Sequence, residues 1–127
     1  MRAVFPYFRK GAQWYPVIDV TLQGAKDEIT VKALLDSGAS FSVFRPEIAD
    51  EIGIAVEKGT PLYLEGIGGR ILGYMHRIPV RVGVKKFLCK FVFSREFTVS
   101  FNLVGRDNFF SNFRITFDDK NKRVILM

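Results

Sequence analysis

The feature that most restricts the fold of this chain is a repeated alternation of apolar and polar residues along short segments. Between residues 17 and 35, apolar side chains recur at every second position on both sides of a turn at 24–27. Successive side chains of a strand point to opposite faces, so this period of two predicts strands with one buried face. Segments with the same period follow at 78–84, 87–93, 113–117 and 124–126. The chain is therefore expected to be mostly β, forming a closed barrel or sandwich.

Two short helices and a glycine-rich hairpin interrupt the predicted strands. Segment 45–53 carries Pro46 in its first turn and ends at Gly53, which favours a short helix, and a second is expected over 108–112. The residues Gly66-Ile67-Gly68-Gly69 are expected at the tip of a hairpin. Tight turns are predicted at Lys85-Lys86 and at 118–122.

Length and composition indicate one packed domain. The chain has 127 residues, 48% of them apolar and 13 of them Phe, which is enough to bury a core without metal or disulfide support. No linker, low-complexity tract or repeat divides it, so residues 1–127 are expected to form a single domain.

Cysteine content and hydropathy bear on location. Cys89 is the single cysteine and cannot form an intramolecular disulfide, which favours a reducing compartment. Pro6 and nearby charges break the first segment before it reaches signal length, and no stretch approaches the roughly 18 apolar residues of a spanning helix. We expect a cytoplasmic protein that does not enter a membrane. The net charge of +6 is scattered along the chain, so nucleic acid is not the expected partner.

Residues 33–40 carry the most informative motif, Ala-Leu-Leu-Asp-Ser-Gly-Ala-Ser. Two apolar strand residues deliver the Asp36 carboxylate onto a turn of small residues. Gly38 allows another backbone to approach closely, and the Ser37 hydroxyl can bond backbone on either side of the turn. Two interpretations stay open at this point, because Asp-Ser-Gly is a favourable turn tripeptide as well as a way to present a catalytic carboxylate.

Two later segments bear on this choice. The glycine-rich tip at 66–69 comes next, and Leu103-Val104-Gly105-Arg106-Asp107 precedes the second expected helix. This succession resembles the retropepsin-like aspartic peptidases. In that family a strand ending in two apolar residues and Asp-Ser/Thr-Gly-Ala is followed by a flap hairpin, and then by two apolar residues and Gly-Arg-Asp/Asn. The resemblance extends from Pro16 to Leu126.

The resemblance implies a role for each matching residue. Asp36 matches the catalytic aspartate, Ser37 the residue whose hydroxyl bonds the partner subunit's loop, and Gly38 the glycine whose carbonyl meets substrate backbone. Gly105 matches the glycine packed beneath the active-site turn. Ala39 and Arg106 are also expected to support the active-site turn. The flap and the substrate pocket are expected at Gly66, Ile67, Gly68, Gly69, Phe41, Val43 and Val104.

One aspartate per chain implies a dimer. Peptide hydrolysis of this kind needs one carboxylate to activate water and one protonated partner to polarise the carbonyl, and two carboxyl groups about 3 Å apart share a proton. We therefore expect a homodimeric aspartic endopeptidase that acts on peptide or protein substrates without metal or cofactor. The alternative is a non-catalytic peptide-binding or dimerisation module on the same fold.

Two departures from the viral members of the family leave details open. Those members commonly place an acid after Asp-Ser/Thr-Gly-Ala, where it pairs with the arginine of Gly-Arg. This chain has Ser40 there, so Arg106 must take another partner, such as Asp107 or a backbone carbonyl. The apolar ending 124–127 could join an inter-subunit sheet or complete the chain's own sheet.

Other candidates have simpler explanations. Asp118-Asp119 is expected in a solvated turn, His76 on a strand surface, and Cys89 in the core; one His and one Cys cannot build a structural zinc site. The aromatic residues of the segment 5–15 alternate with Arg9 and Lys10 and could stack on single-stranded nucleic acid. Such a segment more often packs onto the core or onto another subunit.

Overall fold

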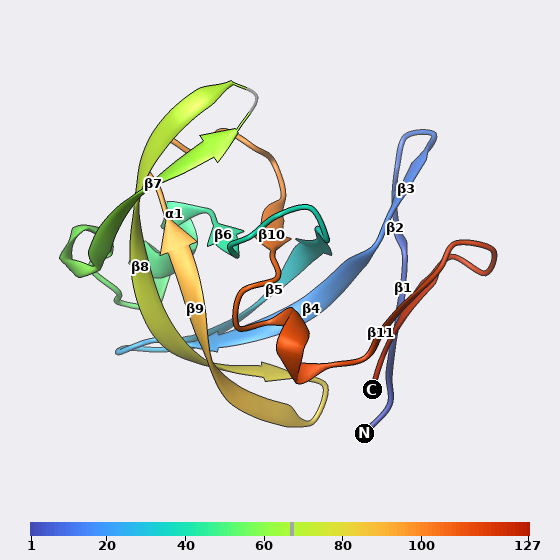
Figure 1. Ribbon diagram of the computed structural model, residues 1–127. Coiled ribbons are helices and arrows are strands. Elements are labelled where there is room, and N and C mark those ends of the chain that lie inside the picture. The colour runs from blue at the N-terminus through green and yellow to red at the C-terminus, as the bar shows by residue number, and fades with distance from the viewer. Residues whose placement is uncertain (67) are drawn as a thin grey trace.

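The computed structural model of the chain describes residues 1–66 and 68–127. These residues form twelve strands, one α-helix and two single-turn 3-10 helices (Figure 1), so the prediction of a mostly β fold is confirmed. The strands are β1 Ala3–Pro6, β2 Phe8–Lys10, β3 Gln13–Tyr15, β4 Val17–Gln23, β5 Glu28–Leu35, β6 Val43–Phe44, β7 Thr60–Gly66, β8 Gly69–Val82, β9 Lys85–Phe93, β10 Asn102–Val104, β11 Ile115–Asp118 and β12 Arg123–Leu126. The helices are α1 Pro46–Glu51, η1 Val56–Lys58 and η2 Phe110–Asn112. No helix in these described residues is long enough to cross a membrane.

The main sheet closes on itself. Its strands follow the order β4-β5-β10-β6-β9-β8-β7, and β4 also pairs with β8, so six of them form a ring with β7 at its edge. Most neighbours are antiparallel, but β10 runs parallel to β5 and β6 runs parallel to β9. The short strands β6, which follows β5, and β10, which follows β9, thereby lie side by side between β5 and β9.

The alternating residues of the sequence fill the inside of this ring. Ile18, Val20 and Leu22 of β4 are 1%, 0% and 0% exposed, as their period predicts. The many phenylalanines serve the same core, since Phe44 and Phe91 are buried with their ring centroids 4.7 Å apart. Burial of each such side chain contributes about 1.5–3 kcal/mol to folding. Cys89 is also fully buried, which confirms the prediction that it is a core residue.

Two predicted local features differ from the structure. The hairpin between β8 and β9 turns at Gly83 and Val84, whereas Lys85 and Lys86 lie in β9. Gly83 adopts a φ of +59°, a conformation that costs glycine little, so the turn forms there and not at the lysines. The helix expected over 108–112 is a single 3-10 turn at Phe110–Asn112.

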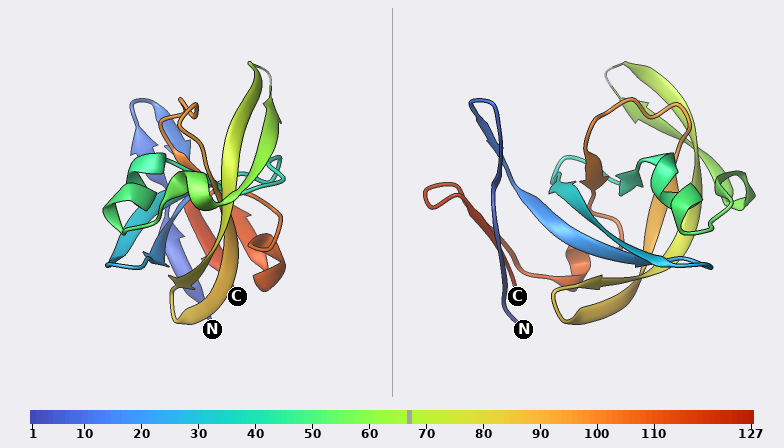
Figure 2. Two further views of the ribbon diagram at one scale, coloured as in Figure 1. Left: turned by 90° about the vertical axis from the view of Figure 1, so that its left-hand side faces the viewer. Right: turned by 180° about the vertical axis from the view of Figure 1, so that it is seen from behind.

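The ends of the chain form a separate sheet of order β1-β12-β11. The apolar ending is therefore the central strand of the chain's own sheet, which is one of the two arrangements expected for it. Between β1 and β4 the chain makes a small hairpin of β2 and β3. Figures 1 and 2 show this hairpin and the terminal sheet extending from the ring on the side where β5 ends.

Candidate active site

Asp36 lies directly after β5, at the point where the chain leaves the ring. Its backbone N–H donates to the carbonyl of Val104 at 3.0 Å, which continues the parallel pairing of β5 with β10. One carboxylate oxygen, Oδ1, accepts a 3.0 Å hydrogen bond from the Gly38 N–H, and the Ala39 N–H donates to the Asp36 carbonyl at 3.1 Å. The small residues thus form a tight turn that orients the carboxylate. Asp36 is half-buried, and Ser37 and Gly38 are exposed.

Gly105 packs against the underside of this turn. A Cβ atom at Gly105 would lie 2.3 Å from the Phe41 carbonyl oxygen and 2.9 Å from that of Ala39. Its N–H donates to the hydroxyl of buried Ser42 at 3.1 Å, and the next N–H, of Arg106, donates to the Ala39 carbonyl at 2.9 Å. The loop after Asp36 is therefore held by the strand end at 103–106, and only a glycine fits at the contact.

A cleft of about 680 Å³ separates the Asp36 turn from the β7–β8 hairpin. Its floor includes Gly38 and Ala39, and the hairpin residues Gly66, Gly68 and Gly69 lie over it. Apolar and aromatic side chains make up most of the rest of the lining, together with two hydroxyl residues and two acids: Phe41, Val43, Tyr63, Leu64, Ile71, Phe97, Val99, Leu103, Ser40, Thr98, Glu65 and Glu96. The shape and lining suit an extended, largely apolar chain that passes beneath the hairpin.

Comparison with known proteins agrees with this geometry. The sequence pattern that defines the aspartyl protease family matches residues 18–97, which include Asp36 and the β7–β8 hairpin. The chain belongs to the aspartyl protease family. DNA damage-inducible protein 1 of Neurospora crassa is 39% identical to this chain over 77 residues, which are 58% of this chain and 17% of that protein. This chain therefore spans less than a fifth of that relative's length.

The fold of this chain is retropepsin-like. A crystal structure of a retropepsin-like aspartic protease from Rickettsia conorii superposes on it with a TM-score of 0.69, covering 99% of this chain and 89% of the other. The sequence identity is 18%, so this likeness concerns the fold alone. The resemblance inferred from three short motifs is confirmed at the level of family and fold.

Most residues expected at the site gather around the cleft. Ala39, Phe41 and Val43 line it together with the glycines of the hairpin, while Ile67 lies outside the described residues. Val104 does not face the cleft but is fully buried, and Leu103 lines the cleft in its place. The reason is the alternation of β10, whose successive side chains point to opposite faces.

Arg106 and Asp107 do not form the pair suggested by the sequence. Asp107 lies 3.6 Å from the ammonium of Lys90, and its N–H donates to the Ser40 carbonyl at 2.8 Å. Arg106 is exposed, and its side chain makes no ion pair or hydrogen bond within the part of the chain that the structure describes. Its backbone supports the Asp36 turn.

Two parts of the site were not identified from the sequence. The loop at 96–99 forms one wall of the cleft, and Ser94 and Glu96 anchor the hairpin above it. The Ser94 hydroxyl donates to the Leu72 carbonyl, and the Leu72 N–H donates to a Glu96 carboxylate oxygen at 3.2 Å. Neither residue lies in a motif, and the contacts join positions more than twenty residues apart.

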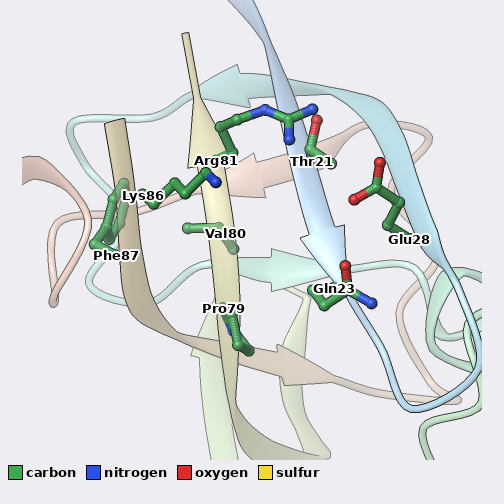
Figure 3. A pocket seen from close by; sticks show the side chains of 8 residues that line it. All are labelled: Thr21, Gln23, Glu28, Pro79, Val80, Arg81, Lys86 and Phe87. Atoms are coloured by element: carbon green, nitrogen blue, oxygen red, sulfur yellow. The ribbon is translucent and has the colours of Figure 1, made fainter. Parts of the chain in front are cut away.

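A second hollow of about 420 Å³ opens between β4, β8 and β9. Figure 3 shows its lining, in which Arg81 and Lys86 lie on the paired strands β8 and β9 and Glu28 on β5. None of the residues expected at the active site lines it. His76 donates a hydrogen bond from its Nε2 to the Val56 carbonyl at 2.9 Å, so this ring nitrogen is bound to backbone.

Proposed function

We propose that the chain is an aspartic endopeptidase that acts as a homodimer, with Asp36 of each subunit supplying one carboxyl group. The observation that carries this proposal is the presentation of Asp36 on a glycine-supported turn, whose residues Gly38 and Ala39 lie at the floor of a cleft covered by a hairpin. One chain holds a single carboxylate at this turn, and the reaction requires two groups in different protonation states.

The chemistry proceeds through water held between the two Asp36 carboxyl groups. The ionised carboxylate takes a proton from this water, whose oxygen attacks the peptide carbonyl carbon, while the protonated carboxyl donates a hydrogen bond to the carbonyl oxygen. A proton then passes to the amide nitrogen as the C–N bond breaks, which leaves a carboxylic acid and an amine. Two carboxyl groups about 3 Å apart share one proton, so the pair is prepared for this division of roles.

The substrate is a peptide in extended conformation, bound between the Asp36 turn and the β7–β8 hairpin. Backbone hydrogen bonds would hold it, as in strand addition, and apolar pockets beside Phe41, Val43 and Leu103 would select its side chains. The site needs no metal or cofactor for this reaction. Buried Cys89 as the single cysteine is consistent with a cytoplasmic location.

Cleavage of an unfolded protein substrate from pH 3 to pH 8 tests the proposal, with sedimentation velocity of the same samples. We expect the wild-type chain to cleave as a dimer and Asp36→Asn to fold and dimerise without cleaving. Asp27→Asn, in the turn between β4 and β5, is the matched control and keeps activity. Cleavage by Asp36→Asn, or by a strictly monomeric wild-type protein, contradicts the proposal.

The second candidate is a non-catalytic peptide-binding or dimerisation module on the same fold. It would use the same cleft without hydrolysis. A folded wild-type dimer that binds an extended peptide but never cleaves one favours this candidate. A dimer whose two Asp36 carboxyl groups lie beyond hydrogen-bonding distance does the same.

A further inference from the structure

The hairpin of β2 and β3, hereafter the arm (residues 8–15), forms a two-stranded sheet of its own. All three residues of β2 are exposed, as are Gln13 and Trp14 of β3. A single two-stranded hairpin is marginally stable in water and needs another surface to pack on. The stability of the arm therefore depends on the surfaces that its two faces contact.

One face of the arm packs on Phe101, the residue that precedes β10. Phe8 and Tyr15 are opposite each other in the hairpin, and both contact Phe101, with ring centroids 6.3 Å and 5.0 Å away. Lys10 lies on the same face, with its ammonium 5.4 Å from the centre of the Phe101 ring. Phe8, Lys10 and Tyr15 are therefore in contact with the rest of the same chain.

The other face carries Arg9 and Trp14, which are paired across the hairpin. The Arg9 guanidinium lies 5.4 Å from the centre of the Trp14 ring, and Trp14 is 43% exposed. Tryptophan and arginine are the residue types that most often dominate protein–protein interfaces. A tryptophan held in place on an exposed face is therefore a candidate contact for another protein.

The arm is anchored at both of its ends. The hydroxyl of buried Tyr7 donates to Asp119 at 2.6 Å, and the Tyr7 N–H donates to the Lys122 carbonyl at 2.8 Å. At the other end, the Leu35 N–H donates to the Pro16 carbonyl at 2.9 Å. The arm is thus held in position at both ends, and its end at Pro16 is bonded to Leu35, the residue before Asp36.

We propose that the arm packs against the partner subunit of the dimer, where Trp14 and Arg9 contact a second copy of this chain. The inference rests on the proposed function, because a shared proton requires the two Asp36 carboxyl groups about 3 Å apart and so brings the two-fold axis close to Asp36. Three strand residues carry the arm about 10 Å from its base. It extends on the side of the ring where β5 delivers Asp36 (Figures 1 and 2), which is the side the partner must occupy.

A second copy fits the arm better than nucleic acid does. A basic groove with free cations attracts phosphates, whereas both cations of the arm, Arg9 and Lys10, already lie over aromatic rings of the same chain. The exposed face is one aromatic ring with a stacked guanidinium, which matches a protein interface.

Fluorescence tests the proposal directly, because Trp14 is the single tryptophan of the chain. The emission of the full-length wild-type protein is measured over a dilution series that crosses the dimer–monomer transition, with sedimentation velocity at the same concentrations. We expect the emission maximum to move to shorter wavelength as dimer forms, since Trp14 becomes buried. An emission maximum that does not change while dimer forms overturns the proposal, and so does a change caused by an oligonucleotide and not by protein concentration.

Substitution supplies the second measurement. Trp14→Ser should raise the dimer dissociation constant on the order of tenfold or more, the effect of losing an interface anchor, and Trp14→Phe should recover part of it. Cleavage by Trp14→Ser should fall at low protein concentration and return at high concentration. Leu88→Ser, which removes another apolar side chain that is 52% exposed, is the matched control and leaves the dissociation constant unchanged.

The outcomes separate this inference from the proposed function. If wild type dimerises and cleaves while Trp14→Ser forms an equally tight dimer, the arm proposal is wrong and the peptidase proposal stands. If wild type forms no dimer at any concentration and cleaves nothing, both are overturned.

Discussion

Gly105 lies directly beneath Phe41, and the two residues leave no room for a side chain between them. A Cβ atom at Gly105 would stand 2.3 Å from the Phe41 carbonyl oxygen, far inside van der Waals contact. The contact joins the end of β10 to the loop that follows Asp36. The orientation of the Asp36 carboxylate therefore depends on a residue that takes no part in the chemistry.

Gly105→Ala should displace this loop. Overpacking against backbone costs about 1–3 kcal/mol or more, since a carbonyl cannot turn away as a flexible side chain can. We expect a lower free energy of unfolding in urea and loss of peptide cleavage. Gly66→Ala is the control for stability, because a Cβ there meets nothing within 4 Å. Equal stability of the two variants would contradict the packing argument.

Ser42→Ala removes the acceptor for the Gly105 N–H, which is donated to the Ser42 hydroxyl at 3.1 Å. Both residues are buried, so the N–H is left without a partner and stability should fall by about 1–3 kcal/mol. Ser40→Ala, at an exposed position two residues earlier, should change the free energy of unfolding by less than about 0.5 kcal/mol. Thermal and urea unfolding of the two variants provide the comparison.

Arg95 couples the stability of the chain to acid pH. Its guanidinium donates to both carboxylate oxygens of Asp50, at 2.6 Å and 2.9 Å, and to Glu57 at 3.1 Å. The hydrogen bonds from Arg95 lower the pKa of Asp50 below its usual 3.8 and that of Glu57 below its usual 4.5. A lowered pKa in the folded state adds stability that is complete above the unfolded value and is lost as pH falls through the folded value.

Arg95→Met should therefore be less stable than wild type near neutral pH, and the difference should shrink as pH falls below the ordinary carboxyl pKa values. Lys58→Met, at the end of the same 3-10 helix as Glu57, is the control. Urea unfolding between pH 2 and pH 7 checks this. If the difference in unfolding free energy between wild type and Arg95→Met does not vary with pH, the ion pairs of Arg95 are not its cause. The same measurement shows whether a loss of peptide cleavage at acid pH comes from the catalytic groups or from unfolding of the protein.

Cys89 should resist thiol reagents in the folded protein. Its side chain is fully buried, and burial raises the pKa of the thiol to about 12, so almost no thiolate forms at neutral pH. We expect modification by iodoacetamide to appear only in denaturant, as measured by mass spectrometry. Rapid modification of the native protein would indicate local opening of β9.

Much of this fold follows from local patterns. The period of two places Ile18, Val20 and Leu22 in the core, and Pro46 with Gly53 marks the ends of the region that forms α1. The motif around Asp36 and the glycines at 66–69 identify the family, because the turn and the hairpin each need particular residues at consecutive positions. These are properties that neighbouring residues impose on one another, so the order of amino acids alone is sufficient to infer them.

The remaining features depend on contacts between distant segments. The way β10 inserts between β5 and β6 decides whether Leu103 or Val104 faces the cleft. The composition of a three-residue strand does not by itself show which of its side chains point to which face. The partner of Asp107 is Lys90 and not the adjacent Arg106 for the same reason. The anchoring of the hairpin by Ser94 and Glu96, and of the arm by Tyr7 and Pro16, likewise joins residues whose separation along the chain carries no signal. Hydrogen bonds and packing of this kind require the closed ring, because closure brings their partners within reach.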